Sequence, residues 1–245
     1  MNFLEIAQEV DTMSGLQGMI QSVVAPIGAQ AVIVSAIRQG FIEIQEDRMT
    51  WEFMRRTGKF MLRGGQDLYQ PRSLFPPKPD LNANPTGLPY EVFGRWQRKW
   101  PATSYSLRNI DMDTGLPTGT WSLIHCIPYR ELRAMAQSTT TEGVPRFVAP
   151  KDNSDDLVFF PTPDHAYECN ADYYVEPQEL MGNAQIPILP SRFHRLLAYA
   201  GLERVGNYYG NPNLYQRYAV AAAKMHGSLY RDQCPAESVT IRAVA

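Results

Sequence analysis

The sequence predicts an α+β fold, in which N- and C-terminal helices form a helical bundle and a β-rich, proline-rich insertion lies between them. Three observations support this fold class. Apolar residues follow a helical period before residue 58 and again after Pro190. Between these parts, glycine and proline become frequent and the helical period ends. Each helical part has an apolar stripe that needs a partner, which the other part can supply.

The domain boundaries follow these changes. We expect residues 1–58 and 191–234 to form the helical body, residues 59–190 the β-rich insertion, and residues 235–245 an extended C-terminal tail. For 245 residues, one domain with an insertion and two small domains are both allowed. No charge occurs between Asp11 and Arg38, but glutamines and serines interrupt that stretch, so we predict no membrane span.

Two helices are expected at the N-terminal end. Residues 2–11 form a short helix, and Pro26 stands where a second helix can begin, because proline is tolerated in a first helical turn. We expect the second helix to continue through Arg55, over about 40 Å at 1.5 Å per residue. Its heptad track holds Ile27, Val34, Ile37, Phe41, Ile44 and Trp51, with Gln30 and Arg48 in the two remaining positions. Ile37, Phe41, Ile44 and Trp51 are the predicted core seam.

The insertion is predicted to hold short strands and loops. Seven prolines in residues 71–101 exclude a central strand there and favour an extended, surface-wrapping arm. Strands are expected near residues 104–109, 120–127, 145–149, 156–161 and 166–175. A hairpin across Asp111–Gly119 joins the first two strands, and residues 129–137 form one helical interlude.

Helices return after Pro190. One face of the first holds Phe193, Leu196, Leu197 and Ala200. Asn211 then supplies an N-cap and Pro212 the first residue of a last helix. The apolar stripe of this last helix runs through Leu214, Tyr218, Ala221, Met225 and Leu229. The tail from Glu237 to Ala245 alternates weakly and is expected to be extended.

Charge is segregated along the chain, although the net charge is only −2. Residues 1–50 and 111–190 are acidic, with six acids to two bases and twelve to four. Residues 51–110 and 191–245 are basic, with ten bases to four acids and seven to three. Such blocks are either solvated faces or complementary surfaces for association with copies of the same chain.

Few patterns point to small-molecule chemistry. The sequence holds no nucleotide-binding loop, no G-x-S-x-G elbow and no H-E-x-x-H pair. Its three cysteines fit neither a disulfide framework nor a C-x-x-C site, which favours a reducing compartment. The N-terminus lacks the basic and apolar regions of a secretion signal. His125 with Cys126 and His165 with Cys169 are zinc candidates, but neighbouring strand residues point to opposite faces, so we expect no metal. His194 and His226 are interpreted as ordinary helix-face residues.

Two alternative functions remain open on the residues alone. A carboxylate-based hydrolase acting on glycans needs two acids about 5–10 Å apart, one with a raised pKa. The candidate acids are Asp152, Asp155, Asp156, Asp164, Glu168, Asp172, Glu176 and Glu179, although Asp155 and Asp156 are also typical of a turn before a strand. A DNA-binding module is the other alternative, since Arg55, Arg56, Lys59 and Arg63 are interleaved with Phe53 and Phe60.

The order of several short motifs carries a family resemblance. The long helix contains Ala36-Ile37, Glu43-Ile44-Gln45 and Trp51-Glu52-Phe53, and the insertion ends in Tyr173-Tyr174-Val175-Glu176-Pro177 and Leu180. Ile186-Pro187-Ile188-Leu189-Pro190, Phe193-His194 and a tyrosine-rich last helix follow. In this order the chain resembles the head-to-tail adaptor proteins of tailed bacteriophages.

The resemblance implies a structural virion protein, with no catalytic residues, metal or cofactor and no membrane partner. Members form a ring, commonly of twelve copies, that docks beneath the portal protein and extends the channel for double-stranded DNA toward the tail. The helices are expected to form the ring body, the insertion to face the tail proteins and the C-terminal extension to reach the portal. The protein would be made in the host cytoplasm and end at the neck of the virion, the portal-tail junction.

Opposed charge blocks and extended arms suit a subunit that grips a neighbour on each side. On this basis the sequence gives a set of candidate interface residues. They are Arg55, Arg56, Lys59, Arg63, Arg95, Arg98, Asp155, Asp156, Glu237, Ile241 and Arg242.

Overall fold

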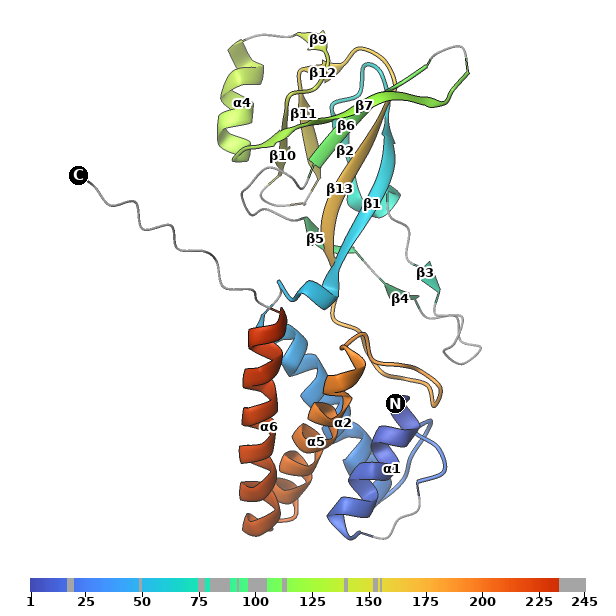
Figure 1. The fold of residues 1–245 in the computed structure, drawn as a ribbon, viewed down its shortest axis with the longest axis vertical. Coiled ribbons are helices and arrows are strands. Elements are labelled where there is room, and N and C mark those ends of the chain that lie inside the picture. Colours follow the sequence, from blue (N-terminus) through green and yellow to red (C-terminus); the bar gives the residue numbers. More distant parts are fainter. Residues whose placement is uncertain are drawn as a thin grey trace, which may run out of the picture. The chain divides into compact units, whose positions relative to one another are not determined.

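The computed structural model describes residues 1–16, 20–48, 50–74, 78–79, 89–91, 93–96, 105–111, 114–138, 141–151, 154 and 156–233. The chain has two compact units, each with its own core (Figure 1). The helical unit comprises Met1–Met54, Pro79–Tyr90 and Pro177–Ala245, and the β unit comprises Arg55–Lys78 and Glu91–Glu176. The predicted α+β class is confirmed, because helices from both ends of the chain flank a strand-rich middle.

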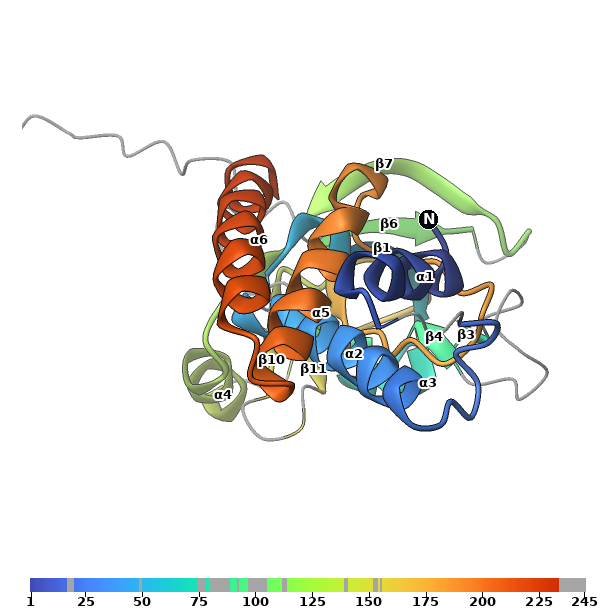
Figure 2. The same ribbon diagram turned by 90° about the horizontal axis from the view of Figure 1, so that it is seen from below.

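The helical unit is built around α5 (His194–Tyr208), which packs against α1 (Phe3–Ser14), α2 (Ala29–Asp47) and α6 (Pro212–Gln233) (Figure 2). Two 3₁₀ turns, η1 (Glu52–Met54) and η2 (Ser191–Phe193), belong to the same unit. α1 begins with a capping box, in which the Asn2 side chain accepts from the Glu5 backbone N–H and the Glu5 side chain accepts from that of Asn2. Among the described residues, no helix has both the length and the apolar character needed to cross a membrane.

The expected extent of the second helix is wrong at both ends. The helix begins at Ala29, so Ile27 lies outside it and is 80% exposed. It ends at Asp47, and Arg48 is already extended. Arg55 instead begins a strand. The physical reason for the early stop is that Trp51 folds back on the last turn, where its Nε1–H donates to the Ile44 carbonyl at 2.8 Å.

The last helix begins where the sequence predicts. The Leu214 backbone N–H donates to Asn211 Oδ1 at 3.1 Å, which is the predicted N-cap, and Pro212 is the first helical residue. Tyr218, Ala222 and Leu229 are its buried side chains, so Ala222 takes the place that we predicted for Ala221. The helix is thus rotated slightly from the predicted stripe.

Glycines allow the helices around α5 to pack closely against each other. A Cβ added at Gly206 would lie 2.7 Å from the Tyr215 backbone nitrogen, and one added at Gly201 would lie 2.8 Å from Ile37 Cγ1. Contacts this short do not occur between real Cβ atoms and backbone. Gly227, in the middle of α6, has open space instead, with no atom within 4 Å.

This contrast gives a matched pair of substitutions. Gly206→Ala should lower the free energy of unfolding by about 1–3 kcal/mol, because the new methyl group meets backbone that cannot rotate away. Gly227→Ala should be neutral or raise it by up to about 1 kcal/mol, through helix propensity alone. Urea unfolding followed by circular dichroism measures both, and equal effects of the two substitutions would contradict close packing at Gly206.

The β unit contains two main sheets. The larger has the order β1 (Arg55–Leu62), β13 (Tyr167–Val175), β6 (Tyr105–Ile110) and β7 (Pro117–Leu123), all antiparallel, and β5 (Phe93–Trp96) also pairs with β13. The second has the order β2 (Leu68–Tyr69), β11 (Leu157–Phe160), β10 (Phe147–Pro150) and β8 (His125–Cys126). Smaller elements are α3 (Pro71–Leu74), α4 (Tyr129–Ser138) and the two-stranded pairs of β9 (Glu142–Gly143) with β12 (Thr162–Pro163) and of β3 (Lys78–Pro79) with β4 (Pro89–Glu91).

An aromatic cluster forms the core of the β unit. Phe159 of β11 contacts Phe60 of β1 and Tyr69 of β2, with ring centroids 6.4 Å and 5.5 Å apart. Trp96 of β5 and Tyr105 of β6 extend the cluster, and both are buried. Large aromatic side chains therefore hold the two sheets together from within.

The sequence predicts most of these elements. The five expected strands, the hairpin from β6 to β7 and the helical interlude α4 are all present, with bounds that differ by four residues or fewer. β1 is missed, because the heptad track through Trp51 imitates a continuing helix. Much of the 71–101 arm lies outside the described residues, but its proline-free part, Phe93–Trp96, is a strand of the large sheet.

Candidate functional surfaces

Part of the opposite charge of the two blocks in the β unit is paired within the chain itself. β1 carries part of the basic block and pairs along its whole length with β13, which carries part of the acidic block. Arg55 Nη2 lies 2.6 Å from Asp172 Oδ2, and the Thr57 hydroxyl donates to Asp172 Oδ1 at 2.6 Å. Arg108 of β6 forms an ion pair with Glu168, its cross-strand neighbour. Antiparallel pairing of neighbouring strands thus brings together charges that are far apart in the sequence, by more than a hundred residues in the case of Arg55 and Asp172.

The remaining candidate interface residues fall into three groups. Arg56 donates from Nη1 to the Arg55 carbonyl at 2.8 Å, and Asp156 accepts from the Ser154 hydroxyl at 2.7 Å in the predicted turn before β11. Lys59 and Arg63 are exposed, and the Lys59 ammonium lies 5.6 Å from the Trp121 ring centroid. Arg98, Asp155, Glu237, Ile241 and Arg242 lie outside the described residues, and only the backbone of Arg95 is described, in β5.

The acids considered for a hydrolase take part in structural contacts. Asp164 accepts a hydrogen bond from the Tyr167 hydroxyl at 2.6 Å, and this bond lowers the pKa of Asp164, helped by His165 beside it. A general acid needs a raised pKa instead. Glu168 and Asp172 are paired with arginines, Glu176 and Glu179 are exposed, and Asp152 lies outside the described residues. None of this favours hydrolysis.

The zinc candidates do not converge. Within the described residues, no group of three or more His, Cys, Asp or Glu side chains could hold a metal ion. The His125 ring lies beside Phe147, whereas Cys169 is fully buried in β13, where burial raises the pKa of its thiol.

His194 is a residue whose role the sequence reading missed. It begins α5 and is buried, with Nε2 2.9 Å from the Leu189 carbonyl and Nδ1 3.0 Å from the Met1 amino group. Burial lowers the pKa of His194, because a charged imidazole is poorly solvated there, and the positive Met1 amino group lowers it further. The ring is therefore a neutral connector between α5 and the preceding segment.

A pH dependence follows from this lowered pKa. The unfolded chain binds a proton at His194 near pH 6.5, whereas the folded chain binds this proton only at a lower pH. Stability is therefore retained above pH 6.5 and falls as the pH drops below that value. Melting temperatures measured across this range should fall less for His194→Gln than for the wild type. His226→Gln is the control, since that side chain is 30% exposed, and equal acid sensitivity of wild type and His194→Gln would exclude His194 as the cause.

The segment Pro177–Pro190, which we call the amide-held segment, has no regular structure, and its buried residues alternate with exposed or partly exposed ones. The Gln45 side chain on α2 bonds to both backbone groups of Gln178, accepting at 2.7 Å and donating at 3.1 Å. The Gln178 side chain in turn accepts from the Ile188 N–H and donates to the Ile186 carbonyl. Gln185 accepts from the Met181 N–H and donates to the Glu179 carbonyl. Buried glutamines thus replace the hydrogen bonds that a strand or helix would provide.

The same segment caps α1 and anchors α2. Its carbonyls at Gln185 and Asn183 accept from the backbone N–H groups of Phe3 and Leu4, the first residues of α1. Arg38 of α2 donates from Nε to the Leu180 carbonyl at 2.6 Å. The amide-rich, uncharged stretch from Met181 to Pro190 was the available sequence signal, because polar residues without charge can be buried at lower cost.

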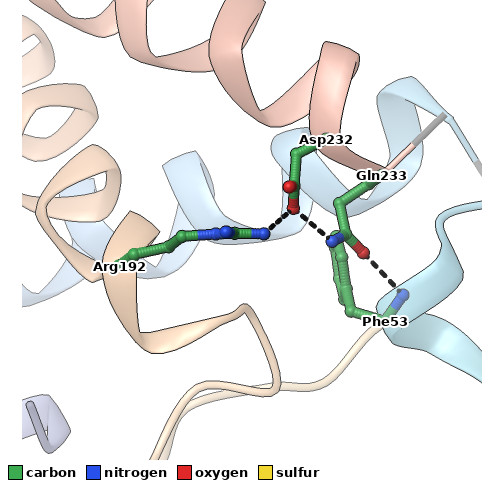
Figure 3. A network of polar contacts seen from close by, with 4 residues as sticks. All are labelled: Phe53, Arg192, Asp232 and Gln233. Carbon is green, nitrogen blue, oxygen red and sulfur yellow. Dashed lines mark hydrogen bonds and ion pairs between the residues drawn. The ribbon is translucent and has the colours of Figure 1, made fainter. Parts of the chain in front are cut away.

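A polar network fixes the C-terminal end of α6 (Figure 3). Gln233 accepts from the Phe53 backbone N–H at 3.1 Å and donates to Asp232 Oδ2 at 2.6 Å. Asp232 also forms an ion pair with Arg192. These contacts lower the pKa of Asp232, chiefly through the hydrogen bond from Gln233. Three separate parts of the chain therefore meet at this point: η1, η2 and the end of α6.

A known protein family matches nearly the whole chain. The family model described as SU10 adaptor protein matches residues 1–238, which spans both units. The chain belongs to the SU10 adaptor protein family. It is therefore a bacteriophage adaptor, a structural component of the virion, as the resemblance in motif order predicts. No curated protein matches the adaptor.

The motifs that carry the resemblance lie at packing positions of the adaptor. Tyr173 and Tyr174 are buried near the end of β13, and Leu180 and Leu189 are buried in the amide-held segment. Trp51 is fully buried beside the α6 residue Tyr230. The residues that define the family pattern therefore stabilise the fold of the adaptor, and they do not show which surfaces bind its partners.

Proposed function

We propose that the adaptor assembles into a closed ring, of about twelve copies as head-to-tail adaptors commonly do, beneath the portal protein. The ring would extend the channel for double-stranded DNA and provide the attachment surface for tail proteins. The observation that supports this proposal most strongly is the family match over residues 1–238. Binding here is mechanical and electrostatic, and no covalent bond is made or broken.

Exposed apolar side chains on the helical unit support association with other copies. Ile27, before α2, is 80% exposed, and Tyr208, at the corner between α5 and α6, is 69% exposed. Ile186 in the amide-held segment is also exposed. The three residues belong to different segments of the subunit, and a heterologous contact that closes into a ring requires two different surfaces.

Mass measurement of the intact protein tests the proposal. The adaptor is measured alone and after mixing with its portal protein, under conditions that preserve complexes, and the mixtures are imaged by electron microscopy. We expect a ring, either in the adaptor alone or on the portal. A single copy in every mixture, or turnover of a cell-wall glycan by the purified chain, would contradict the proposal.

A further inference from the structure

Only one side of α6 is packed. Its buried side chains, Tyr218, Ala222 and Leu229, lie on the side where α6 packs against α5. Figures 1 and 2 both show α6 alongside α5 at one edge of the helical unit. The other side of the helix is exposed at Asn213, Gln216, Arg217, Val220, Ala223, Lys224 and Arg231. This face spans about five helical turns, and the described residues of the helical unit leave it uncovered.

The uncovered face carries a line of positive charge. Arg217, Lys224 and Arg231, which we call the basic stripe, are spaced by seven residues, so they lie in one row about 10.5 Å apart along the helix. No aspartate or glutamate occurs from Pro212 to Arg231. The stripe is therefore purely cationic over about 20 Å.

Three other arginines of the helical unit have acidic partners, whereas the basic stripe has none among the described residues. Arg192 pairs with Asp232, Arg195 with Glu9 and Arg204 with Glu43. Within the described part of the chain, Arg217 lies over the Tyr218 ring and Arg231 donates to the Ser228 hydroxyl, and no stripe residue contacts a carboxylate. No described residue of the subunit therefore neutralises the positive charge of the stripe.

The residues between the stripe members are small. Ala223 is exposed, and Gly227 has open space where a Cβ would stand. The apolar side chain of this face is Val220, which is 71% exposed; Tyr215 and Tyr230, at 40% and 38%, lie nearer the buried side of α6 by helical spacing. Such a face lets a polyanion approach the helix closely, but it lacks the aromatic and apolar anchors of a protein interface. Glu9, Glu43 and Asp232 of the helical unit already pair with arginines of the same chain, so these three acids are not available to the stripe of a second copy.

We propose that the basic stripe of α6 contacts the sugar-phosphate backbone of duplex DNA. The inference deepens the proposed function, on which it rests, by assigning α6 to the wall of the DNA channel. Duplex DNA presents one charge per roughly 1.7 Å of its axis, whereas the stripe offers one cation per about 10.5 Å. That spacing is close to the Debye length at physiological salt, so the cations act almost independently and impose no register on the phosphates. DNA is therefore attracted without being locked in place.

Fluorescence anisotropy with a labelled duplex of mixed sequence tests the inference on the full-length chain. Binding is measured between about 50 and 200 mM salt for the wild type and for the variant Arg217→Gln/Lys224→Gln/Arg231→Gln. Loss of three phosphate contacts should weaken binding at low salt and make the slope of log affinity against log salt shallower by about 2.7. Exposed substitutions of this kind should leave the melting temperature unchanged.

Arg192→Gln/Arg195→Gln is the matched control. Both side chains are well exposed, at 63% and 65%, but each already has an acidic partner. We expect this double variant to bind the duplex with a salt slope near that of the wild type. A loss in the control of about two thirds of that in the triple variant, or more, would overturn the inference, because binding would then follow the number of cations alone.

The remaining outcomes separate the inference from the proposed function. Absence of salt-dependent binding by the wild type, or unchanged binding by the triple variant, would overturn the inference. Loss of ring formation in the triple variant would also overturn it and identify the stripe as a contact between copies. If stripe-dependent DNA binding persists in a chain that never forms rings, the inference stands and the proposed ring fails.

Discussion

Trp51→Ala should lower the free energy of unfolding of the helical unit by about 3–5 kcal/mol, the cost typical of removing a buried tryptophan. The Trp51 side chain is fully buried, stacked on Phe53 at 5.6 Å and in edge contact with Tyr230 at 5.1 Å. The substitution leaves a cavity between these rings. It also removes the donor of the Ile44 carbonyl, which stands where α2 ends. Urea unfolding followed by circular dichroism measures the change.

Two control substitutions separate the contributions at this site. Trp51→Phe keeps an aromatic ring but loses the indole N–H, so it should cost less than the alanine substitution. Trp121→Ala removes a tryptophan that is 38% exposed on β7 and should have a much smaller effect. An unchanged melting temperature for Trp51→Ala would show that Trp51 does not support the helical unit.

Trp51 also shows where prediction from sequence succeeded for an incomplete reason. Its apolar period with Ile37, Phe41 and Ile44 marked it as a core residue, and all four are buried. The same period extended the helix to Arg55, because a heptad track does not record where the backbone turns. The turn depends on a side chain that reaches back seven residues to Ile44, which no local propensity expresses.

Local signals predicted the elements whose determinants are local. Asn211 and Pro212 started α6 because a cap and a first-turn proline act within a few residues. β1 was missed because its partner, β13, lies more than a hundred residues further along the chain. The same pairing explains the charge blocks, which meet as Arg55 with Asp172 in one sheet. The segregation of charge along the sequence therefore partly reflects the pairing of β1 with β13.

The functional surfaces were less predictable than the fold. Family membership follows from motif order, and those motifs are packing positions, so they identify the protein without showing what it touches. The unpaired stripe on α6 becomes visible only when the partners of Arg192, Arg195 and Arg204 are known. A contact between copies depends on residues of a second subunit, which one chain does not display.

Gln45→Leu should lower the free energy of unfolding by about 2–5 kcal/mol, although leucine fills much of the same volume. The Gln45 side chain is fully buried and satisfies both the N–H and the C=O of Gln178. Leucine leaves these two buried backbone groups without partners, and each costs about 1–3 kcal/mol. Hydrogen exchange at the Gln178 and Ile188 amides should accelerate together, because the Gln178 side chain accepts from the Ile188 N–H.

Gln39→Leu is the matched control on the same helix, since Gln39 is exposed, and it should change stability by less than about 0.5 kcal/mol. If Gln45→Leu is equally harmless, the amide-held segment is stabilised by its apolar residues, such as Leu180 and Leu189. If exchange accelerates at Gln178 but not at Ile188, the two glutamines act separately. Coupled exchange with a large loss of stability would show that buried amides hold the segment that caps α1 and anchors Arg38 of α2.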